Sequence, residues 1–258
     1  VATPSLIFSS VAVSDTDAFF SPVILVIAVA TVVTMLIYWA ISALFFRQDA
    51  AETMAGAASS SYYNSVNIGL PIATYVLGDA TFVVPALVLQ MAVLSPIVIA
   101  GLDRGAKGVG KSVVAGLTAP VVVAAFAGFA VSAASWTVPE PVLAPLEILG
   151  GASIPLILMS FGASLTGEKV LTSHRGPTIT ATALKLVGMP AVAWVVATLL
   201  GLDGQEMYAA LILCALPTAQ NVYNYAATYR SGEVICRDTV FLTTFLALPA
   251  MLLIAGVF

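Results

Sequence analysis

The chain has 258 residues, of which 60% are hydrophobic and only 9% are charged, and its formal net charge is −4. Soluble domains carry roughly 25% charged residues, so this composition excludes an ordinary soluble protein and predicts an all-α polytopic membrane protein. The chain has no basic block for nucleic acid and too few cysteines for a disulfide framework. We expect two free thiols, with Cys214 inside a span and Cys236 in a cytoplasmic loop.

Taken in chain order, the sequence holds nine candidate spans, because a span needs roughly 20 mostly apolar residues. They cover residues 1–13, 20–46, 53–77, 81–102, 112–135, 144–165, 177–201, 206–229 and 239–258. The first span is short, and the given chain opens at Val1 with no initiator methionine and without the charged segment that begins a signal peptide. We therefore expect a piece of a longer gene product, truncated within its first span.

The basic residues predict the orientation of these spans. Every second loop is basic, and these loops hold eight of the nine lysines and arginines: 47–52, 103–111, 166–176 and 230–238. Basic loops face the cytoplasm, so we expect a multi-pass protein of the inner (plasma) membrane with its C-terminus outside.

Prolines recur at a nearly constant spacing: Pro4 with Pro155, Pro71 with Pro217, and Pro96 with Pro249. This register divides the chain into a first repeat at 1–103, a cytoplasmic linker at 104–111 and a second repeat at 112–258. The second repeat has five spans and the first has four, so one helix of a likely ten is expected before Val1. Two five-span repeats must have opposite orientations, as in the inverted repeats of many secondary transporters.

Two spans contain helix-breaking residues beside side-chain amides. A proline removes a backbone donor, and a glycine adds backbone freedom. Such breaks leave N–H and C=O groups that need partners inside the membrane, and the N-terminus of a half-helix suits a carboxylate. We therefore predict a substrate site from the residues at both breaks: Asn64, Asn67, Gly69, Pro71, Pro217, Gln220 and Asn221. The alternative is that the prolines only kink two spans and the amides bond neighbouring helices.

Three charged residues lie in or near the spans. Lys185 is inside the seventh span, where a charge is a functional candidate that could attract an anion or take part in coupling. The alternative is that its long side chain reaches the cytoplasmic interface. Glu147, near the outer end of the sixth span, and Asp238, near the inner end of the ninth, could titrate during transport or be simply interfacial.

Residues 105–112 match the phosphate-binding P-loop pattern letter for letter. That pattern binds phosphate only between a strand and a helix, whereas here it joins two spans, so we interpret it as a flexible linker and predict no nucleotide binding. The spans hold no metal-ligand spacing, no paired carboxylates and no nucleophile beside a base. The sequence therefore predicts no enzyme, no metal and no cofactor.

Three short patterns follow one another along the chain: Asn64 with Gly69-Leu70-Pro71, Pro155-Leu156 with the Gly-Ala-Ser-Leu at 162–165, and Leu216-Pro217 with Asn221, Ala226 and Tyr229. In these patterns the chain resembles the auxin efflux carrier family, whose bacterial members are permeases for malonate and similar acids. The resemblance implies ten helices in two inverted sets of five, of which this chain holds helices two to ten. It also implies that the helices crossing at Pro71 and Pro217 form the substrate site.

The chain departs from the family at Asn67, and at Gln220 and Asn224, which make the crossing more polar. These departures favour a larger or more hydrophilic anion than an indole acid. The related bile acid symporters would be expected to show acidic or glutamine sodium ligands at the crossing. No acid lies there in this chain, so sodium coupling is not supported.

We therefore expect a secondary transporter that moves a small organic anion, a mono- or dicarboxylate, by alternating access, with one half rocking against the other. Its expected partners are the substrate and the lipid bilayer, without nucleic acid or nucleotide, and a homodimer is one arrangement open to it. One alternative is a sodium- or proton-coupled symporter of the bile acid type. Another is a membrane sensor subunit that binds a ligand without moving it.

Overall fold

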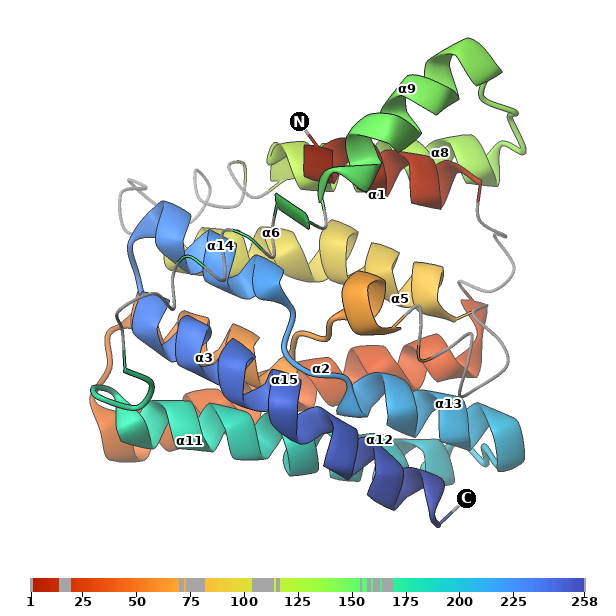
Figure 1. The fold of residues 1–258 in the computed structure, drawn as a ribbon. Coiled ribbons are helices and arrows are strands. Elements are labelled where there is room, and N and C mark those ends of the chain that lie inside the picture. The colour runs from red at the N-terminus through yellow and green to blue at the C-terminus, as the bar shows by residue number, and fades with distance from the viewer. Residues whose placement is uncertain are drawn as a thin grey trace.

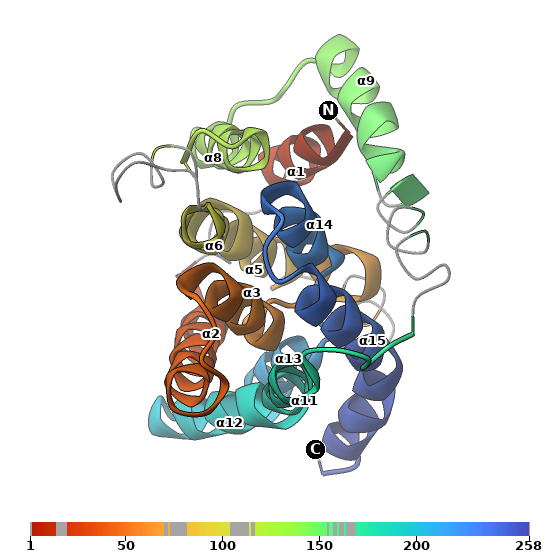
Figure 2. The ribbon, with the colours of Figure 1, turned by 90° about the vertical axis from the view of Figure 1, so that its left-hand side faces the viewer.

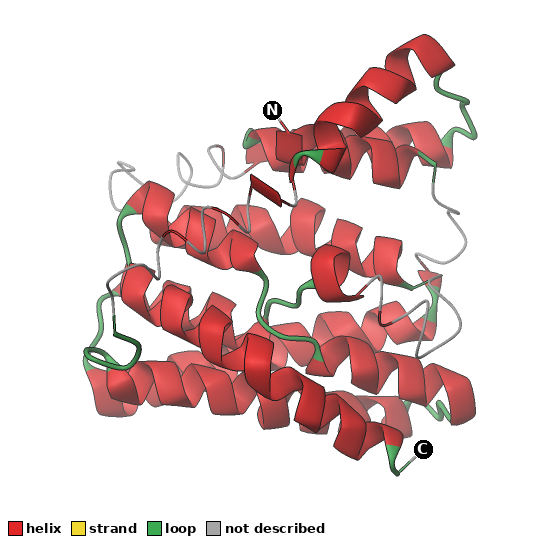
Figure 3. Ribbon diagram, in the orientation of Figure 1, coloured by secondary structure: helices red, strands yellow, loops and turns green. Residues whose placement is uncertain are grey.

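A computed structural model describes residues 2–13, 20–69, 72, 82–103, 114, 117–153, 155–156, 159, 163 and 169–257. Throughout these residues the secondary structure is helical, with no strand, which confirms the all-α fold class (Figure 3). The linker predicted at 104–111 lies outside the described residues.

The predicted first repeat contains α1 (Ala2–Ala12), α2 (Pro22–Ile41), η2 (Ser42–Phe46), α3 (Ala50–Ser61), η3 (Ser65–Gly69), α5 (Val83–Val88), η5 (Leu89–Leu94) and α6 (Ser95–Leu102). The second contributes α8 (Pro120–Ala133), α9 (Glu140–Gly151), α11 (Arg175–Ala183), η6 (Leu184–Gly188), α12 (Met189–Leu199), α13 (Gly204–Ala215), α14 (Gln220–Tyr229) and α15 (Glu233–Ala255). The η segments are π-helical turns that continue or replace α-helix.

Four helices in the described part of the chain are long and apolar enough to cross a bilayer: Pro22–Phe46, Val83–Leu102, Arg175–Leu199 and Glu233–Ala255. Each lies within a few residues of a predicted span. The helices α1 and α8 are apolar but shorter, and the third and eighth predicted spans are each divided in two. A multi-pass membrane protein follows, while the count of nine spans stays a prediction.

The helices pack in two groups, as two perpendicular views show (Figures 1 and 2). The smaller group is α1 with α8 and α9, in which α1 packs against both partners. The larger group contains the remaining helices, where α3 lies among α2, α6, α11 and α15, and α12 packs on α2 and α13. Because α1 lies in the predicted first repeat and its partners in the predicted second, these groups do not coincide with the two repeats expected from the sequence.

A hydrophobic cluster joins the two groups. Ile7 and Val11 of α1 and Ala125 of α8 pack there against residues of the α5–η5 helix, including Leu87 and Met91. The chain also makes a polar contact near two of the prolines whose spacing suggested a repeat, since the hydroxyls of Thr3 and Ser153 lie 2.9 Å apart beside Pro4 and Pro155.

The last helix begins earlier than the sequence suggested. The expected loop reached residue 238, but α15 starts at Glu233, because Gly232 with its φ of +64° allows a sharp turn from α14. Cys236 is therefore not in a loop. It is fully buried in α15, where its Sγ accepts a hydrogen bond from Ser59 Oγ at 3.3 Å.

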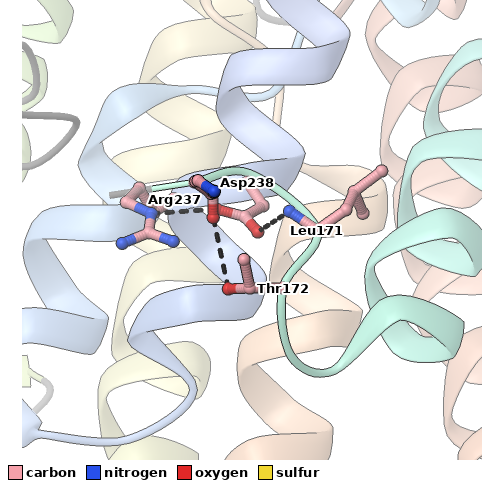
Figure 4. Close-up of polar contacts among 5 residues, drawn as sticks. Leu171, Thr172, Arg237 and Asp238 are labelled. Carbon is pink, nitrogen blue, oxygen red and sulfur yellow. Dashed lines mark hydrogen bonds and ion pairs between the residues drawn. The ribbon is translucent and has the colours of Figure 1, made fainter. Parts of the chain in front are cut away.

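The buried carboxylate of Asp238 holds the loop that precedes α11 (Figure 4). Its Oδ2 accepts the backbone N–H of Leu171 at 2.8 Å, and its Oδ1 accepts Nε of Arg237 at 2.8 Å. In the same loop, Thr172 Oγ1 donates to the carbonyl of Lys169 at 3.2 Å. This geometry favours a structural role for Asp238, which fixes residues 169–174 to the first turns of α15.

Candidate functional site

The described residues show a helix break upstream of Gly69 and Pro71, the residues from which the sequence predicted one. The helix α3 ends at Ser61, because Tyr62 turns into an extended conformation with ψ of 141°, and the π-helical η3 begins only at Ser65. Residues 62–64 are therefore non-helical, and Asn64 is inside the break rather than beside it. Pro71 lies outside the described residues.

The second break lies where Pro217 places it. The helix α13 ends at Ala215, Leu216 is extended with ψ of 147°, and α14 begins at Gln220 after the extended Ala219. The half-helix N-terminus of α14 therefore follows the proline directly, as the sequence predicted for this span.

The two breaks bond to each other through the backbone. The N–H of Asn64 donates to the carbonyl of Pro217 at 2.9 Å, so a group freed by one break satisfies a group freed by the other. Thr218 adds a second link to α3, since its Oγ1 donates to the carbonyl of Ser59 at 2.7 Å, and it ties the second break to α15, since its N–H donates to Oγ1 of Thr243 at 3.1 Å. The breaks are thus one structural unit.

Side-chain amides from both breaks form a cluster at this crossing. Nδ2 of Asn64 and Nδ2 of Asn67 both donate to Oε1 of Gln220, each at 2.9 Å. The backbone N–H of Asn67 donates to Oδ1 of Asn64 at 3.3 Å. The carbonyl oxygen of Gln220 is therefore occupied by two donors, which leaves its amide nitrogen as its remaining group for a ligand.

A cavity of about 30 Å³ lies against this cluster, where both breaks meet α1 and the α5–η5 helix. Its walls are Thr3, Leu6, Ile7, Tyr63, Asn64, Ser65, Asn67, Leu87, Gln90, Ala219, Gln220 and Asn221. A space of this size holds on the order of one or two waters, or one carboxylate group.

Two donors face this cavity with little or no partner. Ser65 Oγ is buried and has no hydrogen-bond partner. Nδ2 of Asn221 has only the sulfur of Met91 at 3.9 Å, which is a weak contact. Buried polar groups normally find partners, so the buried hydroxyl of Ser65, together with the half-buried amide of Asn221, marks a place for a polar ligand. The first turn of α14 adds its positive dipole end.

Sequence reasoning missed Ser65 and Gln90. Gln90, on η5, is 1% exposed and its Oε1 accepts the backbone N–H of Tyr63 at 3.1 Å, which satisfies another group freed by the first break. The available signal was a single amide in the apolar run of the fourth span. Ser65 was visible only as the neighbour of Asn64, because nothing in the sequence indicates that its hydroxyl lacks a partner.

Gly69 allows the two breaks to approach closely. A Cβ at this position would lie 2.9 Å from Cδ1 of Leu216 and 3.2 Å from the carbonyl oxygen of Asn64. Its N–H donates to that same carbonyl at 2.8 Å. The glycine predicted for the site is therefore at the contact between the two breaks.

Lys185, on η6, is fully buried behind the crossing rather than in its cavity. Its Nζ donates to the carbonyl of Cys214 and to the sulfur of Met189, both at 2.9 Å, and lies 5.8 Å from the ring centre of Tyr63. The Cys214 carbonyl belongs to the last turn of α13, which the break leaves without a helical partner. The partners of this ammonium group are thus all neutral.

Glu147 does not join the cluster. It lies on the exposed face of α9, in the smaller helix group, and does not line the cavity. The structure therefore brings together Asn64, Asn67, Gly69, Pro217, Gln220 and Asn221, places Lys185 one residue layer away through Tyr63, and leaves Glu147 apart.

Comparisons with known proteins cover almost the whole chain. A family model described as membrane transport protein matches residues 1–108 and 109–255. A Rhizobium meliloti protein named "Putative malonate transporter" is 25% identical over 264 residues, which cover 97% of this chain and 82% of that protein. An uncharacterized transporter of Methanocaldococcus jannaschii is 28% identical over 107 residues, covering 42% of this chain and 34% of that protein.

Proposed function

Because the chain belongs to the membrane transport protein family, which confirms the resemblance drawn from its sequence patterns, we propose that it moves a small organic anion across the inner membrane by alternating access. One observation carries this proposal. The two helix breaks contact each other around a cavity into which Ser65 and Asn221 present donors that lack strong partners. Carriers of several folds bind substrate where discontinuous helices meet.

The donors at the crossing favour a carboxylate. Asn221 and Ser65 supply neutral N–H and O–H groups, and the N-terminus of α14 supplies a positive dipole end. The relative named for malonate agrees with a carboxylate substrate. The carboxylate would accept from these groups at the cavity, while Asn64, Asn67 and Gln220 hold the two breaks in place.

Lys185 supplies the countercharge in this proposal. Its partners are a carbonyl, a thioether and an aromatic face, so its positive charge is buried without an anion. Burying an unbalanced charge is costly, and an anion bound on the other side of Tyr63 would lower that cost. The site would thus prefer an anion to a neutral molecule of the same shape.

The packing suggests which bodies move. We expected one sequence half to rock against the other, but α1 of the first repeat packs with α8 and α9 of the second. The crossing cavity lies at the boundary of the two helix groups, lined by Thr3 and Ile7 from one group and by the breaks from the other. Relative motion of these groups would expose the cavity to each side in turn.

The test is uptake of labelled mono- and dicarboxylates into proteoliposomes by the full-length protein, with a proton or a sodium gradient imposed. The double variant Asn64→Ala and Asn221→Ala removes the amide link and a free donor. Thr198→Ala, at an exposed position on α12, is the matched control. We expect saturable flux that the double variant abolishes and the control retains.

Other outcomes separate the alternatives. Flux unchanged in the correctly folded double variant would contradict the site but not the carrier. Flux driven only by sodium would favour a symporter of the bile acid type. Saturable binding without flux would favour a membrane sensor.

A further inference from the structure

A second cavity continues from the crossing. It encloses about 360 Å³ between α14 and α6 of the larger helix group and α1 and α8 of the smaller one. Thr3 and Asn221 line both this cavity and the crossing cavity, so the two spaces adjoin at these residues. We call the second cavity the vestibule.

The vestibule extends toward one end of the molecule. Ile99, near the end of α6, and Thr228 and Tyr229, at the end of α14, line its far part. Those helix ends precede the segments at 103–111 and 230–238, whose basic residues predict the cytoplasmic side, although α15 occupies the second segment from Glu233 onward. The vestibule is therefore the route by which a molecule on that side reaches the crossing.

One face of α14 supplies the polar groups of this route. Asn221, Asn224, Tyr225 and Thr228 are spaced by three, four and seven residues, which places them on the same side of a helix. The hydroxyl of Tyr225 lies 3.2 Å from Oγ of Ser95, and Oγ1 of Thr228 donates to a backbone carbonyl at 2.7 Å. The side-chain amide of Asn224 has no hydrogen-bond partner among the described residues, so it is the group left to bind a ligand.

The described lining of the vestibule contains no charged side chain. Charges of both signs lie at the end of α14, since Asp103 interacts electrostatically with Tyr229 and Arg230 follows Tyr229 directly in the chain. A carboxylate in the vestibule would find no cation among the described lining residues to balance its charge, whereas an uncharged hydroxyl group needs no countercharge and can bond to the amide of Asn224.

We propose that the vestibule is a second subsite that receives the tail of the substrate and selects an uncharged polar tail. The preferred substrate is then a monocarboxylate with a hydroxyl group at the other end of a short carbon chain. Its carboxylate occupies the crossing cavity, and its hydroxyl bonds to the side-chain amide of Asn224. This proposal rests on the proposed carrier function and narrows its substrate class from organic anions in general.

Three acids of equal length test it: pentanoate, hydroxypentanoate with a terminal hydroxyl, and glutarate. Each competes against a transported labelled acid in proteoliposomes containing the full-length protein. We expect hydroxypentanoate to inhibit best, by about fivefold over pentanoate, which is the usual effect of one neutral hydrogen bond. Glutarate should be the weakest inhibitor.

Two variants identify the residue responsible. Asn224→Leu should remove the advantage of hydroxypentanoate while leaving inhibition by pentanoate unchanged. Gln205→Leu makes the same chemical change at an exposed position on α13 and should alter nothing. The vestibule proposal would be overturned if Asn224→Leu weakened inhibition by all three acids equally, or if glutarate were the best inhibitor. In either case, flux that depends on Asn64 and Asn221 would still support the proposed carrier function. No flux and no inhibition by any acid would overturn both.

Discussion

The two helix breaks reach the same result by different routes. The second lies at Pro217, where the ring removes a donor and the chain turns extended from Leu216 onward. The first lies at 62–64, in a stretch that contains no proline, where the backbone N–H groups of Tyr63 and Asn64 bond to Gln90 and Pro217 instead of to the preceding turn of helix. The second break is determined by a residue in its own local sequence, whereas the first depends on tertiary contacts with Pro217 and Gln90. The comparison predicts that the first break is more sensitive to changes at its contacts than to its local sequence.

Crowding the contact between the two breaks should have the largest effect on stability. Gly69→Ala places a methyl group 2.9 Å from a fully buried leucine and 3.2 Å from a backbone carbonyl. We expect a loss of stability of about 1–3 kcal/mol, as for overpacking in a core. Thermal unfolding of the detergent-solubilised protein measures it.

Gly151→Ala is the control, because a Cβ there meets nothing within 4 Å. Equal melting temperatures for the two variants would show that the breaks do not need the close approach.

Substitution of Lys185 should affect stability and transport differently. In Lys185→Met, loss of the hydrogen bond to the Cys214 carbonyl is offset by removal of a buried charge, so the melting temperature should stay the same or rise. Anion uptake should fall on the order of tenfold, because a unit charge about 10 Å away is worth roughly 1.7 kcal/mol at an effective dielectric constant of 20.

Uptake assays on Lys185→Arg provide the comparison, since arginine keeps the charge. If the methionine variant transports normally, Lys185 is not the countercharge of the substrate.

Pro217→Ala should have the smallest effect, although it removes the residue that predicts the break. The carbonyl at position 217 remains, so it can still accept the N–H of Asn64, and Thr218 keeps both of its bonds. We expect a change of about 0.4–1 kcal/mol, mostly through the greater freedom of the unfolded chain. Denaturant unfolding would measure the change, and collapse of the fold would mean that the proline itself maintains the break.

Much of the fold follows from the sequence, because long apolar runs set the spans at Pro22–Phe46, Val83–Leu102 and Arg175–Leu199. The hydrogen-bond partners at the crossing could be predicted from the sequence only in part. The amides at 64, 67 and 220 were visible as polar residues in apolar spans. That both asparagines bond to one oxygen of Gln220 depends on how residues more than 150 positions apart meet in space.

The errors have physical causes. The break at 62–64 was not predicted, because the bond from Asn64 to Pro217 that accompanies it is not local, and the break expected at Pro71 stays a prediction because Pro71 lies outside the described residues. The start of α15 was missed because Arg237 and Asp238 suggest a solvated loop. In the fold these charges pair with each other, at 2.8 Å, and Asp238 also accepts a backbone N–H. The grouping of α1 with α8 and α9 was missed because proline spacing reports duplication, not contact.

The small, buried residues of α3 leave this helix little tolerance for amino-acid substitution. Every residue from Thr53 to Ser61 is buried, and most are alanine, glycine or serine. A Cβ on Gly56 would overlap the Tyr38 ring. Substitutions along this helix should therefore be selected against. Positions on the mostly exposed face of α9 should accept exchange of one apolar residue for another. A saturation library would then show intolerance concentrated at the helix that leads into the first break, well beyond the few positions that touch substrate.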